Sequence, residues 1–246
     1  MDATAVSQDV DRFLADHREF IEYLLEWKRG LSPIRLDELT DEGRKGRNLA
    51  ILSVDLIRGF TTEGTLATPR IAGILPAVTD LLRRAYDAGV RDFALMQDTH
   101  PEDSPEFEAF GRHAVAGSSE SQTDDELAAL PFSNEFTVIP KVSLDPAAGT
   151  DLDPWFDERP ALRSVIVVGD CTDICVYQAA MHLHTRAVTM RRGLRVIVPE
   201  NCVQTYDLSV EAASKAGATP HDADFLHLVF LYHLSLCGIE VVSHVA

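Results

Sequence analysis

The chain contains 246 residues, of which 46% are hydrophobic and 25% are charged. These fractions exclude a disordered or fibrous chain, and the length suffices for one large hydrophobic core. The formal net charge of -17 repels phosphate backbones and anionic lipids, so we expect no nucleic acid and no membrane surface as partner. A small neutral or cationic substrate fits this charge better.

The cysteine content favours a reducing compartment. The cysteines at positions 171, 175, 202 and 237 form no C-x-x-C pair. We identify neither a signal peptide nor an apolar run of membrane length. We therefore expect a cytoplasmic protein whose thiols are reduced.

The N-terminal part of the chain has the pattern of an amphipathic helix. Apolar residues between Gln8 and Trp27 recur at helical spacing, and Gly30 marks the end of the pattern. We expect a single domain over residues 1–246, with residues 1–47 as an N-terminal helical extension.

Apolar runs then alternate with helical patterns along the rest of the chain. The runs that predict strands cover residues 49–55, 91–98, 135–141, 163–169, 194–200 and 238–243. The patterns that predict helices cover residues 70–89, 151–162, 173–187, 207–217 and 221–236. Strands that alternate with helices indicate a three-layer α/β/α fold with a six-stranded, mainly parallel sheet.

Polar residues follow several of the predicted strands. Asp55, Asp98, Lys141 and the turn 169–175 each come at the end of an apolar run. Because the ligand crevice of a parallel sheet lies outside the carboxyl ends of its strands, we expect these residues to converge. The polar segment 101–135 is too long for a simple connection, and loops of that length are usually functional.

Cys175 is the candidate nucleophile. It falls in the first turn of a predicted helix, where free N–H groups and the helix dipole favour a thiolate. A buried cysteine taken alone is more often structural. A reactive thiol also needs a proton acceptor and gains from a nearby cation, which Asp55 and Lys141 would supply. Taken singly, Asp55 is explained as a helix cap and Lys141 as a surface cation, but their shared position at strand ends favours catalysis.

Asp98 and His100 have the spacing of a metal site. They are two positions apart at the end of a strand, so their side chains share a face. With His113 from the polar segment they form a ligand set suited to zinc, manganese or iron. The spacing alone is a weak signal, because histidines with other partners outnumber metal ligands.

Five segments of the chain resemble one known family. The segments are VDLIRGF (54–60), QDTH (97–100), FGRH (110–113), PK (140–141) and VVGDCTDICV (167–176). Their order and spacing resemble those of the isochorismatase-like cysteine hydrolases, and among these the nicotinamidases. The pattern G-x-x-T-D-x-C-V is the most specific of them.

The resemblance implies roles for individual residues. Cys175 would be the nucleophile, Asp55 the general base and Lys141 the cation of an Asp-Lys-Cys triad that hydrolyses an amide through a thioester. The peptide bond between Asp170 and Cys171 would be cis. The N–H groups of Cys171 and Cys175 would then form an oxyanion hole.

The resemblance also implies a divalent metal ion, zinc first and manganese or iron as alternatives, held by Asp98, His100 and His113. Some members of the family add a further ligand, for which Glu106 is the candidate here and Glu108 and Glu102 are alternatives. In the family the metal holds the pyridine nitrogen of the substrate. Phe60 and Phe110 stand where the family places aromatic walls, although core packing explains them equally well.

The leading hypothesis is therefore a nicotinamidase, which converts nicotinamide and water to nicotinate and ammonia. Ala114, the acidic segment 102–108 and the extension 1–47 depart from the family, and they leave the substrate open. A related enzyme acting on another small amide, an N-carbamoyl compound or a ureide is the alternative, followed by a non-catalytic binding protein. We expect a homo-oligomer, in which the extension covers the active-site mouth or forms a subunit interface.

The remaining histidines and cysteines receive no functional role from the sequence. They form no common stripe on a helix. We interpret them as caps, packing or surface residues: His182, His184, His221, His227, His233, Cys202 and Cys237.

Overall fold

A computed structural model describes residues 3–40 and 46–246 of the chain. The chain divides into two compact units, Met1–Leu31 and Ser32–Ala246. The division falls earlier than the end of the predicted extension, and residues 1–2 and 41–45 of that extension lie outside the described residues. The single-domain assignment stays a prediction.

The first unit contains helix α1 (Ala3–Arg29), as the apolar spacing predicted. Beyond the helix, the Gly30 N–H donates a hydrogen bond to the Glu26 carbonyl at 2.9 Å. Lys28 and Arg29 occupy the last turn, where positive charge complements the helix dipole. Within the described part of the chain, no helix combines the length and the hydropathy required to cross a bilayer.

The second unit is built on a parallel sheet with the strand order β3-β2-β1-β4-β5-β7, and β6 pairs with β4. The first strand, β1, is central. β2 and β3 are added on one side of it, and β4 is added on the other side. A switch point between β1 and β4 is where such sheets open a crevice. The strands are β1 (Leu49–Val54), β2 (Asp92–Asp98), β3 (Thr137–Lys141), β4 (Ser164–Asp170), β5 (Arg195–Pro199), β6 (Val203–Gln204) and β7 (Glu240–Val242).

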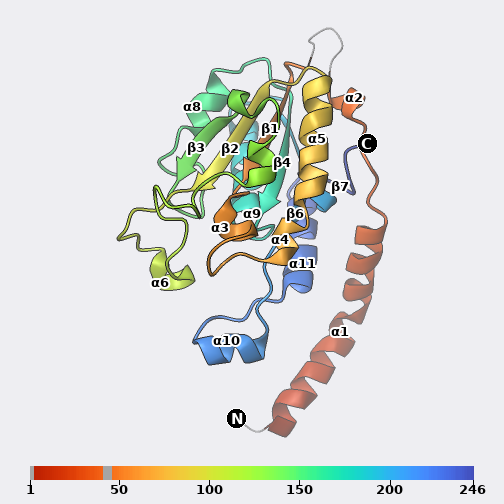
Figure 1. Cartoon of the computed structure of the whole chain (residues 1–246). Helices are drawn as coiled ribbons and strands as arrows, with labels where there is room; N and C mark the ends of the chain where they lie inside the picture. The colour runs from red at the N-terminus through yellow and green to blue at the C-terminus, as the bar shows by residue number, and fades with distance from the viewer. Residues whose placement is uncertain (1–2, 41–45) are drawn as a thin grey trace. The chain divides into compact units, whose positions relative to one another are not determined.

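Helices cover both faces of this sheet, which gives the predicted three layers (Figure 1). Helix α5 packs on one face, and helix α9 contacts β1, β4 and β5 on the other, with α11 beside it. The helices of the unit are α2 (Leu36–Leu39), α3 (Arg58–Thr61), α4 (Pro69–Ala72), α5 (Leu75–Asp87), α6 (Phe107–Phe110), α7 (Asp125–Ala128), α8 (Leu152–Asp157), α9 (Cys175–Thr189), α10 (Val210–Ala216) and α11 (Ala223–Leu236), with the 3-10 turns η2 (Ser133–Glu135) and η3 (Glu200–Cys202).

Several details differ from the sequence prediction, among them the four-residue helices α2, α3, α6 and α7, which were not predicted. The helix expected over 70–89 is divided into α4 and α5, because Pro76 lacks an N–H group and is accommodated in the first turn of α5. Strand β6 was not predicted, since two residues are too few to show a period. The six predicted strands are all present, and every residue of β1 and β4 is buried.

Candidate active site

Asp55, Lys141 and Cys175 meet at the carboxyl edge of the sheet. Asp55 directly follows β1, Lys141 ends β3 and Cys175 begins α9. The Lys141 Nζ lies 2.8 Å from Asp55 Oδ2 in an ion pair and 3.5 Å from the Cys175 Sγ. The side chain of Lys141 is 0% exposed and that of Asp55 is 1% exposed, so this contact is formed away from water.

Backbone geometry places these side chains. Asp55 has φ 56°, and its Oδ1 accepts a hydrogen bond from the Asp98 N–H at 2.9 Å. Gly169 pairs with Val54 in the neighbouring strand, and a Cβ at Gly169 would lie 1.9 Å from the Val54 carbonyl oxygen. Only glycine permits this approach of β4 to β1.

The turn that follows β4 leads into α9. The peptide bond between Asp170 and Cys171 is cis, as the resemblance implied. The Cys171 carbonyl accepts hydrogen bonds from Ile174 N–H at 3.0 Å and Val176 N–H at 3.2 Å. These bonds fold the turn tightly against the first residue of α9.

The pKa values of these three residues depend on their burial and on the charges of their neighbours. Burial and the nearby Asp98 charge raise the pKa of Asp55 to about 7, against the attraction of Lys141. Burial opposes the charge of Lys141, but Asp55, Cys175 and Asp98 raise its pKa well above the usual value. Burial also raises the pKa of the Cys175 thiol well above the usual range, and Lys141 offsets this only in part. Desolvation therefore outweighs the stabilisation of the thiolate by Lys141 and shifts the balance toward the thiol, against the expectation for a helix start.

Asp98, His100 and His113 form a second group beside the first. Their potential ligand atoms all lie within 4.8 Å of one another, and all three residues are buried. Asp98 joins the two groups, since its Oδ1 is 2.5 Å from Lys141 Nζ and 3.4 Å from His100 Nε2. Burial opposes the charge of Asp98, but Lys141 and hydrogen bonds from both histidines lower its pKa below the usual range.

Backbone contacts of the long segment 101–135 place His113 beside Asp98 and His100. The His100 N–H donates to the Ala114 carbonyl at 3.0 Å, and the His100 carbonyl accepts from the Ala116 N–H at 2.8 Å. An antiparallel bridge between Ile57 and Thr123 pairs the segment with the residues that connect β1 to α3.

The two imidazoles are oriented as metal ligands would be. The Nδ1 of His113 is 2.8 Å from the Gly111 carbonyl, and the Nδ1 of His100 is 3.3 Å from Ser104 Oγ. With Nδ1 engaged in this way, the Nε2 of each ring faces Asp98, at 3.4 Å from Oδ1 for His100 and 3.7 Å from Oδ2 for His113, as the ligands of one shared ion would. One carboxylate and two imidazoles fit zinc, and manganese or iron accept the same donors.

The carboxylates considered as an extra ligand have different surroundings. Glu106 is half-buried and lies outside the group of three, and burial together with the Asp98 charge raises its pKa. Glu102 forms an ion pair with the exposed Arg112, and Glu108 is exposed.

Aromatic rings surround His113. The centroid of its ring lies 5.7 Å from that of Phe60 and 6.5 Å from that of Phe110. The sequence reasoning did not select Phe107, whose ring centroid is 5.5 Å from that of His100 and 5.7 Å from that of His113. Its position three residues before Phe110 on α6 was the available signal, because such residues share a helix face.

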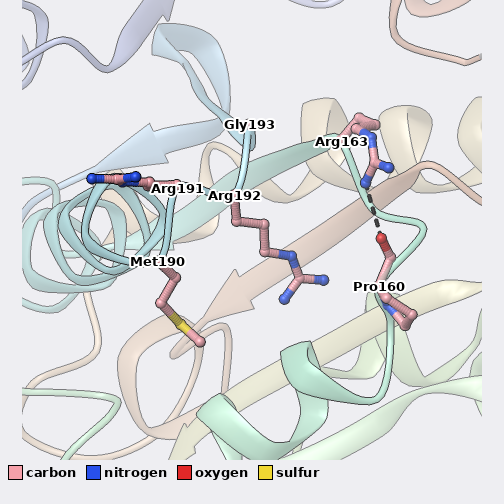
Figure 2. A pocket seen from close by; sticks show the side chains of 6 residues that line it. All are labelled: Pro160, Arg163, Met190, Arg191, Arg192 and Gly193. Carbon is pink, nitrogen blue, oxygen red and sulfur yellow. Dashed lines mark hydrogen bonds between the residues drawn. The ribbon is translucent and has the colours of Figure 1, made fainter.

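A surface pocket of about 530 Å³ lies elsewhere (Figure 2). The loops that line it precede β4 and β5, so it is at the edge of the sheet opposite to Cys175. The guanidinium of Arg192 donates to the carbonyls of Phe156 and Arg159, and that of Arg163 donates to the Pro160 carbonyl. These hydrogen bonds connect the end of α8 to the loops that precede β4 and β5. We therefore interpret Arg163 and Arg192 as residues that stabilise the fold.

The fold and the buried group of thiol, ammonium and carboxylate define an α/β protein of the cysteine hydrolase class. The family model for the Isochorismatase domain matches residues 49–226, and the chain belongs to that family. The chain is therefore an enzyme of the hydrolase class, as the sequence predicted.

Known proteins of this family are similar to the chain over most of its length. Nicotinamidase 1 of Arabidopsis thaliana is 26% identical over 216 residues, which is 81% of this chain and 87% of that protein. The pyrazinamidase/nicotinamidase of Streptococcus mutans has a TM-score of 0.63 and 24% identity, covering 79% of this chain and 99% of that one. The pyrazinamidase of Pyrococcus horikoshii in complex with zinc has a TM-score of 0.61 and 19% identity, covering 79% and 98%. The two solved structures support the fold.

Proposed function

We propose that the protein is a nicotinamidase, which hydrolyses nicotinamide to nicotinate and ammonia through a thioester on Cys175. The observation that carries this proposal is the buried contact of Cys175 Sγ with Lys141 Nζ, itself paired with Asp55. The neighbouring Asp-His-His group and the similarity to the Arabidopsis nicotinamidase favour this amide over others.

Asp55 acts as general base and then as general acid. It takes the thiol proton as the Cys175 sulfur attacks the carboxamide carbon, and it returns that proton to the departing ammonia. Water then attacks the thioester, with Asp55 accepting a proton, and the Cys175 thiol is regenerated with release of nicotinate. A pKa of about 7 suits a group that must both accept and donate a proton near neutrality.

Lys141 and the turn stabilise the charge that develops during these steps. The Lys141 ammonium lies 3.5 Å from the sulfur and favours its anionic form at the moment of attack. The N–H groups of Cys171 and Cys175 serve as the oxyanion hole for the tetrahedral intermediate.

Asp98, His100 and His113 would hold a divalent ion, with Glu106 as a candidate for a further ligand. When bound there, the ion would supply a Lewis acid for the pyridine nitrogen of the substrate. Phe60 and Phe110 flank the ring, so that the carboxamide is directed at Cys175.

Ammonia release from a panel of small amides tests the proposal. We expect nicotinamide to be the best substrate and a chelator to lower its turnover. Failure on nicotinamide, with turnover of an N-carbamoyl compound or a ureide, would assign the protein to a related amidohydrolase. No turnover of any amide, with slow alkylation of Cys175, would favour a binding protein. The homo-oligomer and the cytoplasmic location stay predictions.

A further inference from the structure

Two residues of the turn between Cys171 and Cys175 contact histidines from distant parts of the chain. The Thr172 Oγ1 lies 2.9 Å from the Nδ1 of His227. The Asp173 Oδ2 lies 2.7 Å from the Nε2 of His221. The side chains of His221, Asp173 and His227 are 9%, 6% and 4% exposed, so the contacts are shielded from water.

His221 is itself fixed in place by its surroundings. Its Nδ1 lies 2.8 Å from the Tyr206 carbonyl, and its ring stacks on the Tyr206 ring with centroids 4.0 Å apart. Its backbone exchanges two hydrogen bonds of 2.8 Å with Leu208. The ring therefore bridges a backbone carbonyl and the Asp173 carboxylate with little freedom to rotate.

Asp173 depends on this bridge. Its second oxygen, Oδ1, is buried and has no hydrogen-bond partner among the described residues. Removing His221 would leave a buried carboxylate without its 2.7 Å partner, which is costly for the turn. His227 is oriented in a related way, since its Nε2 lies 3.6 Å from Glu200 Oε1.

We propose that His221 and His227 are positioning residues that fix the turn through Asp173 and Thr172, and so hold the Cys175 thiol against Lys141. The proposal rests on the proposed function of Cys175 as nucleophile. It revises the sequence interpretation of both histidines as caps, packing or surface residues.

The first test is His221→Phe, which retains a ring to stack on Tyr206 and loses both polar contacts. We expect kcat for nicotinamide to fall by about 10- to 100-fold with KM within about twofold, because a small displacement of the reacting atom acts on the chemical step. Alkylation of Cys175 by iodoacetamide should slow in parallel.

A matched control is His182→Phe. His182 Nε2 also lies 2.7 Å from a carboxylate, that of Asp153 on α8, in a contact that does not involve the turn. We expect this variant to retain the wild-type kcat and alkylation rate, which separates a positioning role from the general loss of a His-Asp pair.

The second test is the pair Thr172→Val and Thr172→Ser, and it stays informative if His221→Phe fails to fold. Valine keeps the shape and loses the hydroxyl bonded to His227, so kcat and alkylation should fall, while serine should restore both. Wild-type values in Thr172→Val, and in a folded His221→Phe, would overturn the proposal.

Alkylation requires no substrate, so this test stands even if nicotinamide is not hydrolysed. Unaltered alkylation in the variants would reject the positioning role alone. Altered alkylation without amide turnover would reject only the proposed function.

Discussion

The two buried groups at the edge of the sheet are built differently. The catalytic candidates come from regular elements, the ends of β1 and β3 and the start of α9. The metal candidates include Asp98 from β2, but His113 is carried by the long segment 101–135. The first group therefore depends on regular elements and their ends, whereas the second also depends on a loop that folds back onto the sheet. Asp98 is the connection between them, through Lys141 at 2.5 Å.

The largest effect is expected from Cys175→Ala. Removing the proposed nucleophile should lower kcat by at least about 10³-fold, because the thioester can no longer form. Alanine fills the buried position with a small apolar group, so the melting temperature should change little. Ammonia release and a thermal melt check both statements.

The control for that variant is Cys237→Ala, since Cys237 follows the last turn of α11, where its Sγ lies 3.7 Å from the Nδ1 of His233. It should retain wild-type turnover. A collapse of the melting temperature in Cys175→Ala, with part of the activity retained, would indicate a packing role for the thiol.

Lys141→Met should reduce both activity and stability. The variant keeps the length of the side chain but leaves Asp55 and Asp98 buried without their shared cation. Breaking a buried pair of this kind costs about 3–5 kcal/mol, and turnover should be lost with it. Denaturant unfolding measures the loss of stability. The control is Lys215→Met, which removes the lysine of an exposed ion pair with Glu211.

Two metal-site variants sharpen the comparison between the groups. His113→Ala should abolish bound metal and weaken nicotinamide binding, with alkylation of Cys175 unchanged within about twofold, because His113 has no part in the first group. Asp98→Ala should lose metal and also alter alkylation, since Asp98 contacts Lys141. Elemental analysis and alkylation rates measure these effects. Equal behaviour of the two variants in both assays would contradict the division into two groups.

The positions of residues at strand ends could be predicted from the sequence. Asp55, Asp98 and Lys141 each follow an apolar run, and parallel strands bring such residues to one edge whatever the loops do. The resemblance to the family added three further predictions. It assigned a role to each of these residues, it predicted the cis peptide bond, and it selected His113 from a segment without a clear helical or strand period. The positions of the longer helices followed from apolar spacing, except where Pro76 divides α4 from α5, whereas the four-residue helices α2, α3, α6 and α7 were not predicted.

Contacts made by loops could not be predicted in the same way. His221 and His227 have no regular spacing with Asp173 and Thr172, because the contact depends on how the chain returns after β6. The raised pKa of the Cys175 thiol also needed the structure, since the sequence indicates a helix start but not the degree of burial.

The smallest effect is expected from Phe107→Leu, which tests whether α6 contributes to the loop-borne group. The ring of Phe107 contacts both imidazoles edge-on, with centroids 5.5 and 5.7 Å away. An aromatic pair of this type contributes about 0.5–1.5 kcal/mol beyond its buried area, so KM for nicotinamide should rise by a factor of about 2 to 10 while kcat is retained. Steady-state kinetics on the metal-loaded protein measure this. A fall in kcat with unchanged KM would instead show that α6 acts on the group around Cys175. The two groups could then no longer be separated by the elements that carry them.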